Sequence, residues 1–256
     1  MWRHKRIRMQ RHFAATECLI LMLGYRIKNL LDKSAIPNYN VNVVNVYDVN
    51  ISLGGKQMDT KDKILEVAKK EFIKRGFEDA SMRSIASQVG ISATALYRHY
   101  SNKEEIFEAV VGPVVEKWNR FCDTERIRQT STAWDHGLEA MWEDDRQLGM
   151  IVDMIYEDID EQRLLFCGSE GTKYENFLHD LVTKVQKYTL LFMSGLEKPG
   201  VHVEHVDGRE MHLLLTSEYS CILEMLKHDF SYDEARHYAY TVAMFFTEGW
   251  RKFLGF

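Results

Sequence analysis

A closely punctuated stretch between Asp59 and Glu105 constrains the fold of this 256-residue chain more than any other feature. Helix-capping residues and glycines alternate along it at short intervals. Gly76 and Gly90 are placed to end helices, because glycine adopts a left-handed conformation without steric cost. Only three prolines occur in the whole chain, and helix-forming residues are abundant. The sequence therefore predicts an all-α protein that begins with short helices joined by tight turns.

The capping residues indicate where these helices begin. We expect the first helix to start at residue 59 or 60 and to run to about residue 75, with apolar side chains at helical spacing. Ser81 is placed to cap a second helix, and Ser92 a third helix of about two turns. Asn102 and its neighbours carry a capping signal for a fourth. Two short helices joined through a glycine turn form a helix-turn-helix arrangement.

The third helix has few inward positions and an outer face suited to nucleic acid. Small residues at its start would let its N-terminus approach base edges, and the polar groups that follow would reach the groove wall. Lys103 adds a cation at the next helix N-terminus, where a phosphate is favoured. Arg83 or Arg98 could bind a guanine or, equally, a phosphate. We expect DNA contacts from Ser81, Arg83, Ser92, Ala93, Thr94, Tyr97, Arg98, His99 and Lys103.

Residues 60–107 resemble the N-terminal domain of the TetR family of bacterial transcriptional regulators. The likeness rests on several motifs that occur in the same order as in the family: Gly76-Phe77, Ser81, Ile85-Ala86, Gly90-Ile91-Ser92, Leu96-Tyr97-Arg98-His99-Tyr100 and Lys103-Glu104. One departure is Met82, which stands where a threonine is common in the family. The resemblance covers about a fifth of the chain. It implies a homodimeric repressor that leaves double-stranded DNA when a small-molecule effector binds the C-terminal domain. An activator or nucleoid-associated factor with the same DNA-binding domain remains an alternative.

The first 57 residues differ from the rest in charge. They hold nine Lys or Arg and three Asp or Glu, whereas the remainder is acidic. A Gly-Gly-Lys segment that can encode a ribosome-binding site precedes Met58, so we expect residues 1–57 to be upstream sequence or a disordered extension. A basic arm that contacts DNA or membrane is the alternative. The expected domains are then 58–105 for DNA binding and 106–256 for effector binding and dimerisation.

The C-terminal part is expected to be helical throughout. Periodicity predicts helices at 103–121, 126–145, 147–166, 173–195, 209–228 and 233–254. The last two should be antiparallel neighbours, because a short connection joins them. Their apolar faces suit either internal core or, as the family resemblance favours, a dimer interface. We expect that interface to include Leu215, Tyr219, Ile222, Tyr238, Val242, Phe245 and Trp250.

Methionine and aromatic side chains are frequent in the middle helices. They suit an adaptable effector cavity, although ordinary core packing is the simpler interpretation for any single one. The neighbouring acidic clusters indicate a solvated face, with a cationic effector as the less favoured alternative. We expect the cavity to be lined by Trp118, Met141, Trp142, Met154, Phe177 and Phe192.

No pattern in the sequence predicts catalysis, a cofactor or a metal. His202, His205 and His212 lie close together but lack the HExxH spacing of a zinc site. The four cysteines are widely spaced, which indicates reduced thiols in a cytoplasmic protein. Apolar runs are too short to span a membrane. A helical enzyme or ligand carrier with a vestigial DNA-binding domain is the alternative from another class.

Overall fold

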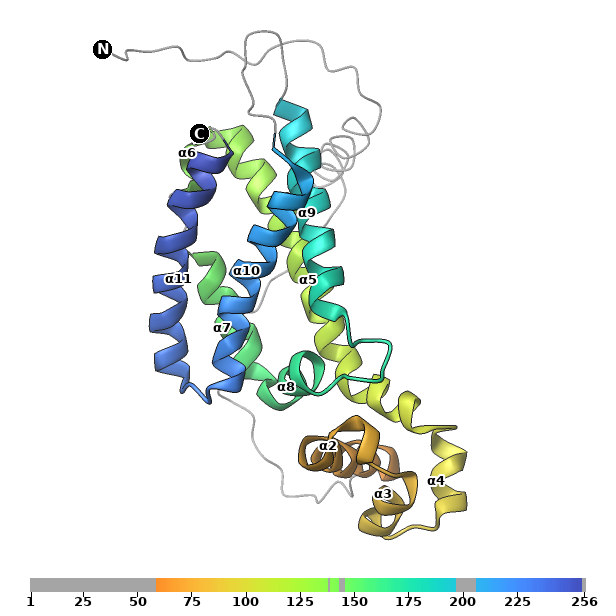
Figure 1. Ribbon diagram of the computed structural model, residues 1–256. Coiled ribbons are helices and arrows are strands. Elements are labelled where there is room, and N and C mark those ends of the chain that lie inside the picture. The colour runs from red at the N-terminus through yellow and green to blue at the C-terminus, as the bar shows by residue number, and fades with distance from the viewer. Residues whose placement is uncertain (1–58, 138, 143–145, 197–205, 255–256) are drawn as a thin grey trace, which may run out of the picture. The chain divides into compact units, whose positions relative to one another are not determined.

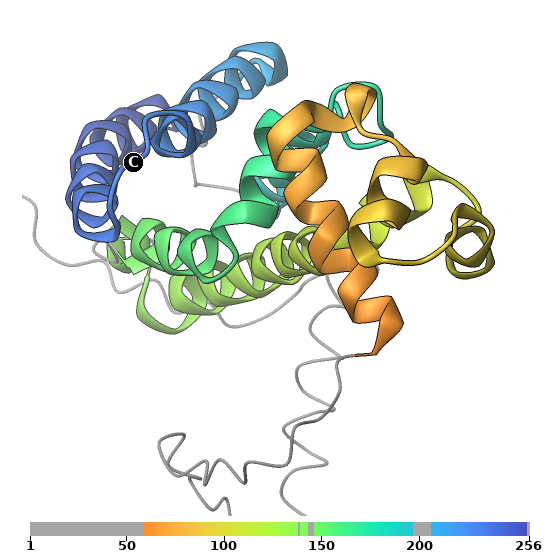
Figure 2. The same cartoon turned by 90° about the horizontal axis from the view of Figure 1, so that it is seen from below.

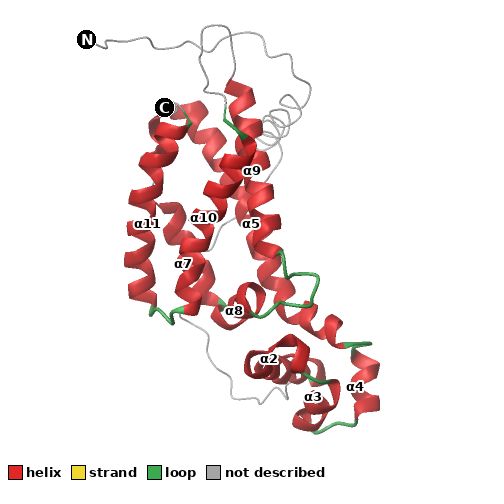
Figure 3. Ribbon diagram, in the orientation of Figure 1, coloured by secondary structure: helices red, strands yellow, loops and turns green. Residues whose placement is uncertain are grey.

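The computed structural model describes residues 59–137, 139–142, 146–196 and 206–254, and every regular element in these ranges is an α-helix (Figure 3). The predicted all-α fold is confirmed. No helix in these ranges is long and apolar enough to cross a membrane. The predicted extension at 1–57 and the histidines at 202 and 205 lie outside the described residues.

The first three helices begin where the capping pattern predicts, and the second and third also end there, whereas the first continues past Gly76 to Asp79. Helix α2 (Thr60–Asp79) is interrupted at Gly76, whose φ of 75° and ψ of 169° are not helical. Helix α3 (Met82–Val89) starts after Ser81, whose Oγ accepts a hydrogen bond from the Ser84 N–H, and stops at Gly90 with φ 82°. Helix α4 (Ala93–His99) follows Ser92, whose Oγ accepts from the Ala95 N–H.

A small core holds these helices against the start of α5. Ile85 of α3 and Leu96 of α4 are fully buried. Phe72 and Phe77 of α2 each lie against Phe107, with ring centroids 5.2 Å apart in edge-to-face pairs. Aromatic pairs of this geometry add to the stabilisation that burial alone provides. The core therefore fixes the position of α4 relative to the long helix that follows it.

Helix α5 (Lys103–His136) is a single helix of 34 residues. The expected break between residues 121 and 126 is wrong. The helix passes through Pro113 because buried side chains before and after it, including Val110 and Trp118, pack it against the rest of the domain. Helical stability in proteins comes mainly from such tertiary packing. It ends at Gly137, which has a φ of 94°.

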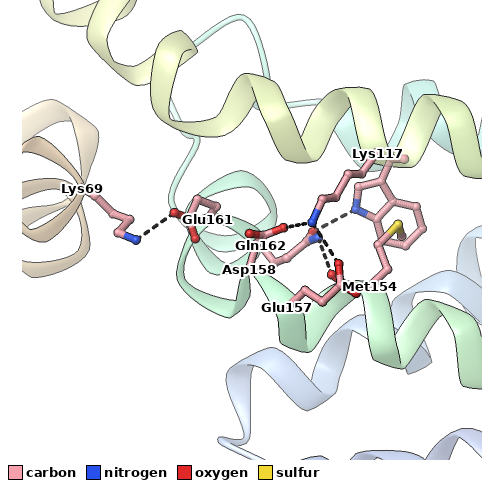
Figure 4. Close-up of polar contacts among 8 residues, drawn as sticks. Lys69, Lys117, Met154, Glu157, Asp158, Glu161 and Gln162 are labelled. Carbon is pink, nitrogen blue, oxygen red and sulfur yellow. Dashed lines mark hydrogen bonds and ion pairs between the residues drawn. The ribbon is translucent and has the colours of Figure 1, made fainter. Parts of the chain in front are cut away.

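The expected single helix at 147–166 is two helices, α7 (Arg146–Glu157) and α8 (Ile159–Cys167), preceded by the short α6 (Glu139–Trp142). The chain leaves the helical conformation at Asp158, which has φ −133° and ψ 48°. Lys117 of α5 binds the carboxylates of both Glu157 and Asp158 at this corner (Figure 4). The break thus depends on a partner far away in sequence.

The last three helices are α9 (Phe177–Leu196), α10 (Gly208–Lys227) and α11 (Tyr232–Phe253). Helices α10 and α11 run antiparallel beside each other, as predicted (Figure 1). Ser231 and Glu234 form a capping box at the start of α11. Helix α8 contacts both α5 and α2, which also contact each other directly, and in the view from below it lies beside α2 (Figure 2).

We predict that the buried hydrogen bond from Trp118 Nε1 to Gln162 Oε1, 2.9 Å long, couples α5 to α8. Gln162→Leu should lower the free energy of unfolding by about 1–3 kcal/mol, because the indole N–H is left unpaired. Trp118→Phe combined with Gln162→Leu should cost less than the two single changes added together. Chemical denaturation of the four proteins measures this. Simple additivity of the two costs would contradict the coupling.

Candidate nucleic-acid interface and ligand cavity

Helix α4 buries one side and leaves its predicted DNA-facing side exposed. Leu96 is fully buried and Tyr100, just after the helix, is nearly so, as their spacing predicted. Tyr97 is 52% exposed, which is a large fraction for an aromatic side chain. Of the remaining predicted residues on this segment, Ala93 is half-buried and four are exposed: Ser92, Thr94, Arg98 and His99.

The segment that carries this face contains no acidic residue. From Ser81 to Lys103 there is no Asp or Glu, although Arg83, Arg98 and Lys103 are basic. Ser81 and Arg83 are both exposed at the start of α3. Positive groups gathered on one face attract a phosphate backbone even when the whole chain is acidic. The exposed side of α3 and α4 therefore carries no carboxylate of its own that would repel duplex DNA.

Lys103 is an exception among the predicted contacts. Its Nζ donates a hydrogen bond of 2.8 Å to the Glu78 carbonyl oxygen and lies 4.3 Å from the centre of the Phe77 ring. The ammonium group holds the end of α2 against the start of α5, and a contact of Lys103 with a phosphate stays a prediction.

A buried carboxylate that sequence reasoning missed joins α2 to α3. Glu71 is 3% exposed, accepts a hydrogen bond of 2.8 Å from Gln88 Nε2, and lies 3.1 Å from Arg75 Nε. Burial alone would raise the pKa of Glu71, but hydrogen bonds from Ser84 and Gln88 and the charge of Arg75 lower it. A glutamate within an amphipathic helix gives no sequence signal that it faces inward.

Comparison with known proteins agrees with this geometry. Residues 64–110, which span most of α2, all of α3 and α4 and the start of α5, match the model of bacterial regulatory proteins of the tetR family. The DNA-binding part of the chain is therefore similar to the N-terminal domain of that family. Among curated relatives, the transcriptional repressor AcnR of Corynebacterium efficiens is 31% identical over 62 residues, which is 24% of this chain and 33% of that protein.

The transcriptional regulator QacR of Staphylococcus aureus is 35% identical over 71 residues, or 28% of this chain and 38% of that protein. The match thus spans about a third of the length of these two relatives. A solved TetR-family transcriptional regulator from Bordetella parapertussis has a TM-score of 0.53 at 14% identity. The similarity covers 78% of this chain and all of that one, so the two folds are alike over the C-terminal helices as well.

A cavity of about 220 Å³ lies in the C-terminal helices, walled by α5, α6, α7, α9, α10 and α11. Of the residues predicted to line it, Trp142 and Phe192 do so. Trp118, Met154 and Phe177 do not, and the expectation is corrected for these three. Trp118 is fully buried against the rings of Phe121, Phe166 and Tyr219, while Phe177 packs on Phe166. The side chain of Met141 lies outside the described part of the chain.

The sequence pattern did not predict three ionisable groups that line the cavity. Glu125 is paired with Arg128, whose Nη2 lies 2.7 Å from its Oε2. The guanidinium of Arg126 lies 4.9 Å from the centre of the Tyr188 ring. Glu218 accepts a hydrogen bond of 2.7 Å from Trp250 Nε1, and burial raises the pKa of its carboxyl to about 7. Each is polar on a helix whose apolar spacing dominates the pattern.

Several residues predicted for a dimer interface are internal instead. Leu215, Tyr219 and Ile222 are buried and, with Trp250, line the cavity, so they have little surface to offer a partner. Val242 is buried in the core and Tyr238 packs on Phe230. Phe245 is 75% exposed and alone among the predicted residues keeps a large free surface. The error arose because one helix face can serve the core and a partner with the same apolar spacing.

No cluster of three or more histidine, cysteine or acidic side chains in the described ranges is arranged to hold a metal ion. His212 instead contacts the ring of His179, with Nε2 and Nδ1 3.2 Å apart, and its Nδ1 lies 3.1 Å from Gln186 Oε1.

We predict that Glu71→Gln destabilises the protein by about 1 kcal/mol at pH 7, because charge-assisted hydrogen bonds are lost. The pKa of Glu71 is lowered in the folded state, so this advantage of the wild type is complete above the ordinary value of 4.5. It should vanish as the pH falls through the lowered pKa and the wild-type carboxyl becomes neutral.

Denaturation curves from pH 7 to pH 3 measure the difference. Glu116→Gln, at an exposed pair on α5, is the matched control and should have little effect at any pH. A cost of Glu71→Gln that stays constant with pH would show that the charge does not join α2 to α3.

Proposed function

We propose that this chain is a cytoplasmic, homodimeric transcriptional repressor whose residues 58–105 bind DNA and whose residues 106–256 bind an effector and dimerise. The exposed, acid-free side of α4 is the observation that carries the proposal. The family model and the curated relatives support DNA binding over the alternative of an enzyme or carrier with a vestigial domain.

Helix α4 is the element that would enter the major groove. The side chains at its N-terminus are small, which allows a close approach to base edges: Ser92, Ala93 and Thr94. Tyr97, Arg98 and His99 then face the sugar-phosphate walls or a guanine. A second copy of the chain would place its own α4 about 34–36 Å away, one helical turn along the duplex. The operator is therefore expected to be nearly palindromic.

The outer sides of α10 and α11 offer a surface for that second copy. Exposed apolar side chains gather there: Leu213 at 65%, Leu214 at 39%, Tyr240 at 60%, Met244 at 61% and Phe245 at 75% exposure. Apolar groups this exposed on two adjacent helices mark an interaction site more often than a free surface. A two-fold axis through this surface would bury the same residues of both chains.

Effector release requires a connection from the cavity to α4. Helix α5 supplies cavity residues such as Cys122 and Glu125 and also begins directly after the DNA-binding helix. A ligand that binds better to a conformation with a different α4 spacing would lower DNA affinity. Only such differential affinity can move the equilibrium.

We predict that Arg98→Ala and Tyr97→Ala each weaken binding to duplex DNA flanking the protein's own gene by about tenfold, the effect of losing one good contact. Mobility shifts at several salt concentrations measure it. Arg120→Ala, on the exposed surface of α5, is the matched control and should bind like wild type. Wild-type binding by both α4 variants would exclude this helix as the DNA-contacting element.

We predict that Phe245→Glu converts the dimer to a monomer that remains folded, because the side chain is exposed within one chain. Light scattering gives the mass and circular dichroism the helical content. DNA affinity should fall with it, by more than about tenfold, since two half-sites are no longer bound together. Ile127→Glu, at a 51% exposed site on α5, should leave the dimer intact. A dimeric Phe245→Glu protein would place the interface elsewhere.

A further inference from the structure

Glu218 is an unusual residue to find in the wall of the cavity. The wall is otherwise largely apolar and aromatic where α10 and α11 meet, with Tyr219, Ile222 and Trp250 as neighbours. One carboxylate oxygen, Oε2, accepts the indole N–H of Trp250. Among the described residues the other oxygen, Oε1, has no hydrogen-bond or ion-pair partner. A carboxylate held in such surroundings without a cation is costly unless a ligand compensates it.

The other ionisable groups around the cavity do not neutralise Glu218. From α5, Glu125 is engaged by Arg128 and Arg126 lies over Tyr188 of α9. Burial raises the pKa of Cys122 to about 11 and that of Tyr188 to about 12, so both are neutral near pH 7. Tyr219 is likewise neutral, because burial raises its pKa. The residues of α7 and α11 that line the cavity do not ionise.

The size and walls of the cavity limit the ligand. At about 220 Å³ it is smaller than the 300–1,000 Å³ of typical drug-sized sites but larger than a cavity of about 150 Å³ that holds benzene. Aromatic side chains, among them Phe121, Trp142 and Trp250, contribute to the wall. Such faces attract a cation as well as an apolar body. A molecule with one ring and a short charged arm fits this volume.

We propose that the cavity recognises a small aromatic or aliphatic compound with a protonated amine, and that the Glu218 carboxylate is the group that binds the amine. The ammonium would take the position beside Oε1 and leave the Trp250 hydrogen bond in place. Because Glu218 lies on α10 and Trp250 on α11, the bound amine would also brace the two helices of the proposed dimer surface. A regulatory role for the amine rests on the proposed function, but binding of the amine to the cavity can be measured without DNA.

Three probes of nearly equal size separate the possibilities: phenethylamine, 2-phenylethanol and phenylacetate. Titration calorimetry on the intact protein, followed by tryptophan fluorescence, gives the affinities. At pH 8 phenethylamine should bind at least about tenfold more tightly than the neutral alcohol, the size of one charge-assisted contact. Between pH 8 and pH 6 its affinity should fall by about tenfold, because a carboxyl with a pKa of about 7 becomes largely neutral while the amine stays charged.

Glu218→Gln keeps the shape of the side chain and the acceptor for Trp250 but removes the charge. It should abolish both the preference for the amine and its pH dependence, while leaving the affinity for 2-phenylethanol unchanged. Glu210→Gln, an exposed acid in the first turn of the same helix, is the matched control and should behave like wild type.

Three results would overturn the assignment. Equal binding of the three probes would show that charge is not recognised. Tighter binding of phenylacetate would make Arg126 the anchor. An amine preference that survives Glu218→Gln would place the recognising group elsewhere. Mobility shifts without any probe test DNA binding separately, so a protein that binds its DNA and ignores phenethylamine would refute the amine and leave the proposed function standing.

Discussion

The position of helix α8 is the constraint on which the rest of the structure depends. Its Glu161 forms a half-buried ion pair of 2.8 Å with Lys69 of α2, and this hydrogen bond raises the pKa of Lys69 (Figure 4). Its buried Gln162 accepts a hydrogen bond from Trp118 of α5. At the corner that joins α7 to α8, Lys117 of α5 binds the carboxylates of Glu157 and Asp158. Helix α8 thus has polar contacts with both α2 and α5, which also pack directly on each other.

The two proposed binding regions differ in their electrostatics in a way that suits a regulator. The segment from Ser81 to Lys103 carries basic side chains and no acidic one, which favours a polyanion in salt-dependent contact. The cavity instead holds the carboxylate of Glu218 in apolar surroundings. Long helix α5 is common to both, because it begins beside α4 and contributes to the cavity wall. A ligand that binds in the cavity and shifts α5 would then change the position of α4 without any direct contact between the two regions.

The DNA-binding helices could be predicted from sequence because their boundaries are local. Ser81, Ser92 and Gly90 act within a few residues of their own positions, and the structure places each as the capping pattern indicates. The break at Asp158 could not be foreseen, because the residue that binds its carboxylate, Lys117, lies on another helix. Several predictions of cavity and interface residues were wrong for a related reason. Leu215 and Phe245 both lie on apolar helix faces, but only tertiary packing decides that Leu215 lines the cavity while Phe245 faces solvent.

We propose that two copies of α4, held at a fixed distance by the C-terminal helices, bind one duplex together. The mass of the complex formed with a DNA fragment from beside the gene, measured by sedimentation at low salt, tests this most directly. We expect two chains on one duplex, or a multiple of two. A complex with a single chain, or no complex with any such fragment, would contradict it.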